Sequence, residues 1–73
     1  MDKDKKSKIR TLLNYWIAHN KEHSQEFREW AQKAKVFGEA EAGEEMLEAA
    51  QAMDKANEPL LRALTRLGGG INP

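Results

Sequence analysis

The sequence predicts an all-α fold, an antiparallel helical hairpin that forms a four-helix bundle as a homodimer. In two long segments, apolar residues recur at alternating spacings of four and three, the rhythm of helices that pack on helices. Gly38 separates the two segments, and β-branched residues, which favour strands, are few. At 73 residues the chain is short, so residues 1–73 are expected to form a single helical-hairpin domain.

The first helix is expected at about residues 7–37. Asp4 or Ser7 can cap its start, and Gly38, directly after Phe37, is typical of the left-handed residue that ends a helix. The repeating positions are Ile9, Leu13, Trp16, Asn20, His23, Phe27, Trp30, Ala34 and Phe37. All but two of these side chains are apolar, so this face is expected to pack against other helices.

A short turn at about residues 38–40 leads into a second helix, expected at about 40–67. Its repeating positions are Gly43, Met46, Ala50, Met53, Asn57, Leu60, Leu64 and Leu67. The pattern keeps its phase across Pro59, so we expect a kink near this residue rather than a third short helix that starts there. Three glycines stop the second helix and leave residues 68–73 as a flexible tail.

Polar residues interrupt both apolar patterns at matching levels. Folding the chain at Gly38 places Asn20 level with Asn57, and His23 level with Asp54. A buried polar group that lacks a partner costs roughly 1–3 kcal/mol, so these side chains are expected to pair with one another. Such a polar layer would set the register of the helices, as buried asparagines do in coiled coils.

The aromatic side chains of the first helix require more cover than one hairpin provides. Trp16, Phe27 and Trp30 each offer roughly 150–250 Å² for burial. A core of this size rarely supplies more than about 3–5 kcal/mol by itself. A second copy related by a two-fold axis would complete a four-helix bundle, so we expect a homodimer.

A cluster of histidine and carboxylate side chains is the candidate site. His19, His23 and Glu26 share one face of the first helix and lie about one turn apart. Two histidines at this spacing can bind a divalent transition metal such as nickel, cobalt or zinc, and Glu26 with Asp54 or Glu58 could complete the ligand set. The alternative is a structural or protein-interaction module, in which these polar residues only set helix pairing.

The composition argues against several functional classes. Twelve basic residues balance twelve acidic ones, so no net charge attracts nucleic acid or an anionic membrane. Without cysteine the chain has neither disulfides nor thiolate ligands, which fits the cytoplasm. Nothing approaches the roughly 20 apolar residues of a membrane span. Since no nucleophile has a shaped pocket and no glycine-rich loop follows a strand, we expect a non-enzymatic accessory protein.

One motif of the first helix is specific: Trp16-Ile17-x-His19-Asn20-x-x-His23, followed by Phe27 and Trp30. With this motif, residues 12–34, about a third of the chain, resemble a short helical domain of unassigned function. That domain occurs alone or after histidine-rich segments in prokaryotic proteins that handle nickel, cobalt or other metals. The resemblance implies a role in metal handling, with a larger metal-handling protein as a candidate partner.

Overall fold

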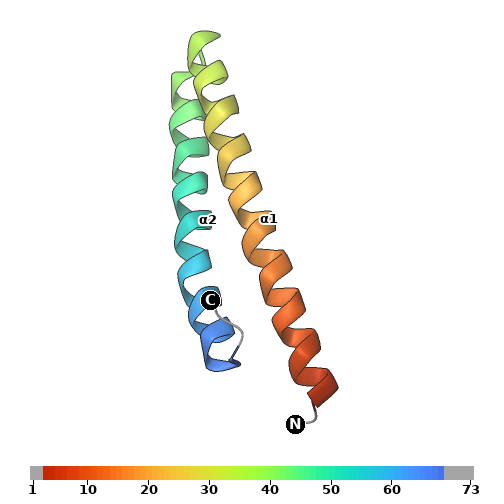
Figure 1. Ribbon diagram of the computed structural model, residues 1–73. Coiled ribbons are helices and arrows are strands. Elements are labelled where there is room, and N and C mark those ends of the chain that lie inside the picture. The colour runs from red at the N-terminus through yellow and green to blue at the C-terminus, as the bar shows by residue number, and fades with distance from the viewer. Residues whose placement is uncertain (1–2, 69–73) are drawn as a thin grey trace.

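The structure, a computed structural model, describes residues 3–68 of the chain. Two helices, α1 (Lys3–Val36) and α2 (Ala40–Arg66), run antiparallel and pack side by side as a hairpin about 53 Å long (Figure 1). The predicted all-α hairpin is therefore confirmed, and residues 3–68 contain no strand. Neither helix is both long enough and apolar enough to cross a membrane.

The turn between the helices depends on Gly38. Its φ of 90° lies in the left-handed region, which a residue without a side chain adopts readily. Its amide donates to the carbonyl of Lys35 at 3.1 Å, and the amide of Glu39 donates to the carbonyl of Ala34 at 2.8 Å. This pair of bonds is a Schellman motif, which ends α1 at Val36 and leaves the chain pointing back along it.

The outer ends of the hairpin differ in detail from the expected bounds. α1 begins at Lys3, about one turn before the expected start at Ser7, because lysine is a good helix former and Asp4 complements the helix dipole. α2 continues through Pro59 as a single helix, so no third helix starts there. Of the expected tail, residues 69–73 lie outside the described part of the chain.

α2 packs on α1 with the face that its apolar pattern predicts. Gly43, Ala50 and Leu64 are buried, and the other repeating positions of α2 are half-buried. This agreement follows from the size of the side chains: the pattern combines small residues near the turn with leucines near the end of the helix. The pattern of α2 therefore fits α1, which lies close to it near the turn and farther away at the other end.

α1 presents a different face to α2 from the one expected. Leu13, Ser24 and Ala31 are buried, whereas Trp16 is 44% exposed and Trp30 is 55% exposed. The second helix thus leaves much of both tryptophans uncovered, in line with the expectation that they need more cover than one hairpin provides. The physical reason is distance, since the small Ser24 and Ala31 allow a close approach that two indole rings would prevent.

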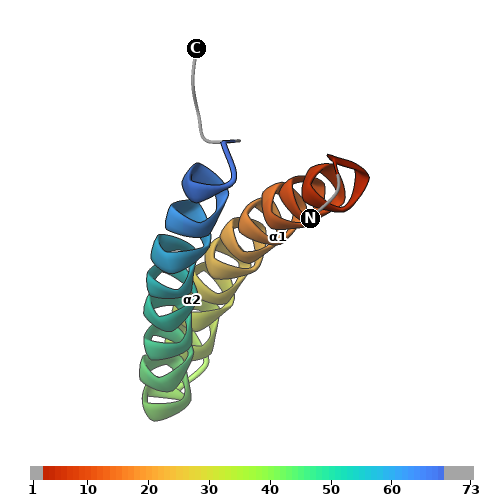
Figure 2. The same cartoon turned by 90° about the horizontal axis from the view of Figure 1, so that it is seen from below.

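The helices are closest near the turn and diverge toward the start of α1, as two perpendicular views agree (Figures 1 and 2). Near the turn, a β-carbon added at Gly43 would lie only 2.8 Å from the carbonyl oxygen of Ala31. At the open end, a guanidinium nitrogen of Arg10 donates to the carbonyl of Leu67 at 2.8 Å, which ties the ends of the helices together.

Candidate functional site

The polar layer begins with an asparagine pair between the helices. Asn20 donates from its side-chain amide to the side-chain oxygen of Asn57 at 3.0 Å. Asn57 in turn donates to the backbone carbonyl of Ile17 at 3.1 Å. Both asparagines are half-buried, and the predicted pairing of Asn20 with Asn57 is confirmed. Each link joins α1 to α2, so the pair defines how the helices align along their length.

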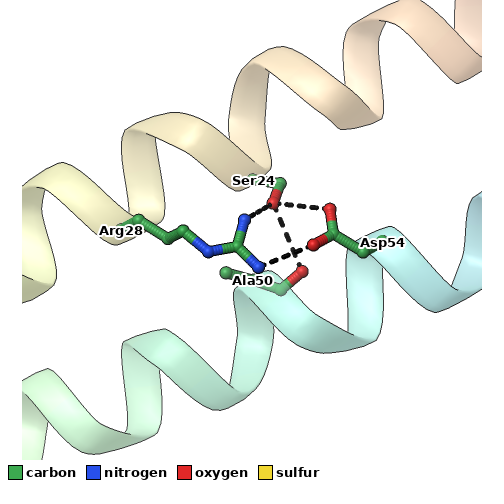
Figure 3. A network of polar contacts seen from close by, with 4 residues as sticks. All are labelled: Ser24, Arg28, Ala50 and Asp54. Carbon is green, nitrogen blue, oxygen red and sulfur yellow. Dashed lines mark hydrogen bonds and ion pairs between the residues drawn. The ribbon is translucent and has the colours of Figure 1, made fainter.

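Asp54 forms a second network, with Ser24 and Arg28 rather than with His23 (Figure 3). The hydroxyl of Ser24, a residue only 1% exposed, donates to one carboxylate oxygen of Asp54 at 2.7 Å. Arg28 donates to the other carboxylate oxygen at 2.6 Å and also to the oxygen of Ser24. These bonds, first from Arg28 and then from Ser24, hold the pKa of Asp54 below its usual value.

His23 was expected to lie level with Asp54, but the residue of α1 that contacts Asp54 is the next one, Ser24. Ser24, the next residue along, points at α2, and its hydroxyl also lies 3.4 Å from the carbonyl oxygen of Ala50 (Figure 3). A hydroxyl has one proton, so the shorter contact to Asp54 is the bond it makes. Since successive residues of a helix point about 100° apart, His23 lies to the side of this network.

The two histidines contact each other on α1. Their Nε2 atoms are 3.0 Å apart, and their rings meet edge to face with centroids 4.4 Å apart. Tyr15 stacks on His19 at a centroid distance of 5.3 Å, and Phe27 lies 6.1 Å from the ring of His23. The other nitrogen of His23, Nδ1, is 3.2 Å from a carboxylate oxygen of Glu26. Tyr15 therefore restrains the ring of His19, and Phe27 and Glu26 restrain the ring of His23.

This geometry indicates which atoms are available for chemistry. A proton on Nδ1 of His23 points at Glu26, which leaves Nε2 of the same ring with a lone pair. Nε2 of His19 donates a proton to that lone pair in the neutral pair. The side chain of His23 is 39% exposed and His19 is exposed, so the histidine pair lies at the surface of the hairpin. A metal ion could bind both Nε2 atoms once His19 carries its proton on Nδ1.

The five predicted ligands do not form one set. His19 and His23 converge, but Glu26 contacts the opposite side of the His23 ring from Nε2, where it orients the imidazole. Asp54 is bonded to Ser24 and Arg28, and Glu58 is exposed on α2. Within residues 3–68, no group of three or more histidine, aspartate or glutamate side chains is arranged to hold a metal ion.

A row of large side chains runs along α1 to the residue after its end and includes one histidine of the pair. We call it the α1 stripe; its members, at seven-residue spacing, are Ile9, Trp16, His23, Trp30 and Phe37. Its tryptophans and Phe37 are largely exposed, and the ammonium of Lys33 lies 4.1 Å from the centroid of the Trp30 ring. Members of the stripe directly precede the residues that face α2, so the stripe lies about a quarter-turn away from α2.

Ser24, Arg28 and Ala31 are the residues that sequence reasoning missed. A signal was present, because the small residues Ser24 and Ala31 are seven residues apart, as are the small Gly43 and Ala50 of α2. Neighbouring aromatic residues give a stronger apolar signal, and this obscured the row of small side chains.

A protein-family model described as a domain of unknown function (DUF8180) matches residues 9–67, a range that includes most of both helices. No curated protein and no solved structure matches the chain.

Proposed function

We propose that this chain, which belongs to the DUF8180 family of domains of unknown function, is a small non-enzymatic accessory protein of the cytoplasm that acts as a helical interaction module. In this proposal the hairpin pairs with a second copy of itself, and the two form a four-helix bundle. The exposure of the α1 stripe is the observation that carries the proposal.

The apolar core of one hairpin is small. Among the described residues, the buried apolar side chains are Leu13, Ala31, Ala50 and Leu64, two of which are alanines. Trp16, Trp30 and Phe37 remain 44%, 55% and 78% exposed. Each aromatic side chain offers roughly 150–250 Å², so its burial contributes more than the alanines can. A partner that covers the stripe would supply the missing core.

The arrangement of faces on α1 fits a bundle. A helix in a four-helix bundle contacts two neighbours, on faces about a quarter-turn apart. One face of α1, with Ser24 and Ala31, already contacts α2. The α1 stripe lies a quarter-turn away, where the second neighbour of α1 would pack. The self-complementary interface of a two-fold dimer requires one such face per copy.

Sedimentation equilibrium of the purified chain tests the proposal. We expect a dimer at micromolar concentration, and at least a tenfold weaker dimer for the double variant Trp16→Glu, Trp30→Glu. The control is Val36→Glu, because Val36 is 82% exposed and points away from the stripe. A wild-type chain that is monomeric at these concentrations would overturn the proposal.

Binding of a divalent transition metal is a second candidate function, favoured by the two Nε2 atoms 3.0 Å apart. His19 and His23 would bind nickel, cobalt or zinc, as imidazole nitrogens do. A larger metal-handling protein would then be the natural partner. Calorimetry with the three ions tests this candidate, and the double variant His19→Ala, His23→Ala should lose binding but still dimerise.

The outcome also decides the role of the polar layer. If no ion binds more tightly than it binds an unstructured peptide, the metal candidate fails. The asparagine pair, Asn20 with Asn57, then sets helix pairing without a metal.

A further inference from the structure

We infer that dimerisation builds one metal site on the two-fold axis, where His19 and His23 of both copies bind a single divalent transition-metal ion through their Nε2 atoms. The inference rests on the proposed function, because the second copy supplies half of the ligands. It differs from a site within one hairpin, in which carboxylates of the same chain would complete the shell.

The histidine pair of one copy has nearly the geometry of two neighbouring metal ligands. Zinc binds imidazole at about 2.0–2.1 Å, which in a tetrahedral site separates two ligand nitrogens by about 3.3 Å. The Nε2 atoms of His19 and His23 are 3.0 Å apart, so an opening of a few tenths of an ångström suffices. When the ion binds, the proton on Nε2 of a neutral His19 moves to Nδ1 of the same ring, so both Nε2 atoms offer lone pairs.

Neighbouring side chains hold the rings in this arrangement. Glu26 lies 3.2 Å from Nδ1 of His23, the nitrogen opposite the metal-facing one. A carboxylate in this position fixes the tautomer that leaves Nε2 free and makes the ligand more basic. Tyr15 stacks on His19 and restrains that ring. In this site Glu26 therefore orients the ligand His23 and does not itself bind the ion.

One copy cannot complete the site from its described residues. Zinc is almost always bound by four ligands when it serves a structural role, and the pair supplies two. Asp54 is bonded to Arg28 at 2.6 Å and to Ser24 at 2.7 Å, and Glu26 is directed at the opposite nitrogen of His23. The two missing ligands must come from elsewhere.

The α1 stripe is centred on the histidines. Trp16 and Trp30 lie seven residues on either side of His23, and Ile9 and Phe37 lie fourteen residues on either side. The midpoint of α1 itself falls between His19 and Asn20. When two copies of α1 pack antiparallel along their stripes, the two-fold axis therefore passes at the level of the histidines. Four imidazoles then meet there, flanked by tryptophans from both copies.

Charge complementarity favours a second copy in this orientation over a parallel one. The start of α1 is basic, with Lys6 and Lys8 exposed. The turn end of the hairpin is acidic on balance, because its glutamates outnumber Lys33 and Lys35; they are Glu39, Glu41, Glu44, Glu45 and Glu48. Antiparallel packing places the basic end of each copy beside the acidic end of the other. A parallel arrangement would bring like charges together.

The test combines calorimetry and sedimentation of the full chain with zinc ions. We expect one zinc ion per two chains and a dimer dissociation constant at least tenfold lower with zinc than with EDTA. Cobalt(II) should give the intense visible absorption of a tetrahedral site. The variants His19→Gln and His23→Gln should each lose the zinc effect and keep the dimer seen in EDTA. Glu29→Gln is the matched control on α1 and should behave as the wild type.

Two further variants separate the roles of the residues. Glu26→Gln should weaken zinc binding by about 10–100-fold without a change in stoichiometry, as expected for a supporting carboxylate. The double variant Trp16→Glu, Trp30→Glu, as a monomer, should bind zinc no more tightly than an unstructured peptide, because only two ligands remain. Circular dichroism checks that each variant is helical.

The possible failures are distinguishable. A dimer with one zinc ion per chain, or with no zinc binding, overturns the shared site and leaves the proposed dimer standing. A chain that is monomeric both with zinc and with EDTA overturns the inference and the proposed function together.

Discussion

Ser24 shows how the hairpin satisfies a polar group inside its helix interface. Its hydroxyl is buried, yet it donates to Asp54 and accepts from Arg28, so the residue has partners on both helices (Figure 3). Neutral hydrogen bonds contribute about 0.5–1.5 kcal/mol each, and bonds to charged groups contribute more. The network thus specifies the register at a position where an apolar residue would only fill space.

The stability of the hairpin should fall in acid through Asp54. Its pKa is below the ordinary 3.8 in the folded chain, because Arg28 and Ser24 donate to the carboxylate. The unfolded chain takes up the proton first, so the stabilisation is present above about pH 4 and is lost as the pH falls through 3.8 toward the folded value. Urea unfolding between pH 7 and pH 3 measures this loss.

The variant Asp54→Asn should show a smaller loss of stability over the same pH range. Glu45→Gln, at an exposed position of α2, is the control and should follow the wild type. If Asp54→Asn and the wild type lose stability equally in acid, the network does not act through this carboxylate.

Substitution of Gly43 by alanine should destabilise the hairpin by about 1–3 kcal/mol, the usual cost of overpacking. The added β-carbon would lie 2.8 Å from the carbonyl oxygen of Ala31, which is backbone and cannot move alone. Alanine favours helix over glycine by about 1 kcal/mol, so the sign of the result separates packing from propensity. Chemical denaturation measures it.

The control for that substitution is the exposed neighbour Ala42. Ala42→Gly should cost about 1 kcal/mol through helix propensity alone. A Gly43→Ala variant at least as stable as the wild type would show that the helices are farther apart at this level.

At the scale of the elements, α1 has two distinct faces, one that contacts α2 and one that carries the α1 stripe. The face toward α2 combines Leu13, Ser24 and Ala31, and small side chains there bring the helices close near the turn. The α1 stripe carries the large side chains a quarter-turn away. The apolar surface of α1 therefore extends over more of the helix than contact with α2 alone requires. Such a wide apolar surface is typical of helices that pack against two neighbours.

Pro59 weakens α2, and its replacement should strengthen the helix. α2 continues through this residue, although proline lacks the amide that would bond to the preceding turn. Pro59 is exposed, so Pro59→Ala removes no packing and should stabilise the chain by up to about 3 kcal/mol. Thermal and urea unfolding measure the gain. Glu58→Ala, the exposed neighbour, should change stability by less than about 0.5 kcal/mol, and a less stable Pro59→Ala chain would contradict the expectation.

At the scale of the whole molecule, the proposed dimer links folding to association. If the stripe is covered by a second copy, most of the apolar burial depends on that copy, and stability depends on concentration. A tenfold rise in chain concentration adds about 1.4 kcal/mol per dimer, so the melting temperature should rise by about 3–6 °C. Calorimetric scans over a hundredfold range of concentration measure this rise. A melting temperature independent of concentration would contradict a dimer that couples to folding.

Several features were predictable from the sequence because they depend on local chemistry. The left-handed turn at Gly38 follows from a glycine directly after an apolar helical pattern, and the packing face of α2 follows from its four-three spacing. The pairing of Asn20 with Asn57 was also predicted, since antiparallel helices joined by a short turn leave little freedom in level.

The rotation of α1 about its own axis was not predictable in this way. Two apolar columns on one helix compete for the same neighbour, and periodicity alone cannot rank them. The same uncertainty affects the candidate site, because a rotation of about 100° separates His23 from Ser24. The rotation of α1 decided that Asp54 bonds to Ser24 and Arg28. It also left the histidines in contact with each other, away from α2.

The sequence by itself determined the class of fold, the hairpin turn, the level of the polar layer and the spacing of the two histidines. These features depend on residues that are close together in the sequence, so the geometry of each helix and of the turn is enough to predict them. Only the tertiary structure decided which face of α1 contacts α2, and with it which polar groups pair. The physical reason is steric: the helices approach where the side chains of both are small, at Ala31 with Gly43, and this closest contact leaves the tryptophans and the histidine pair outside.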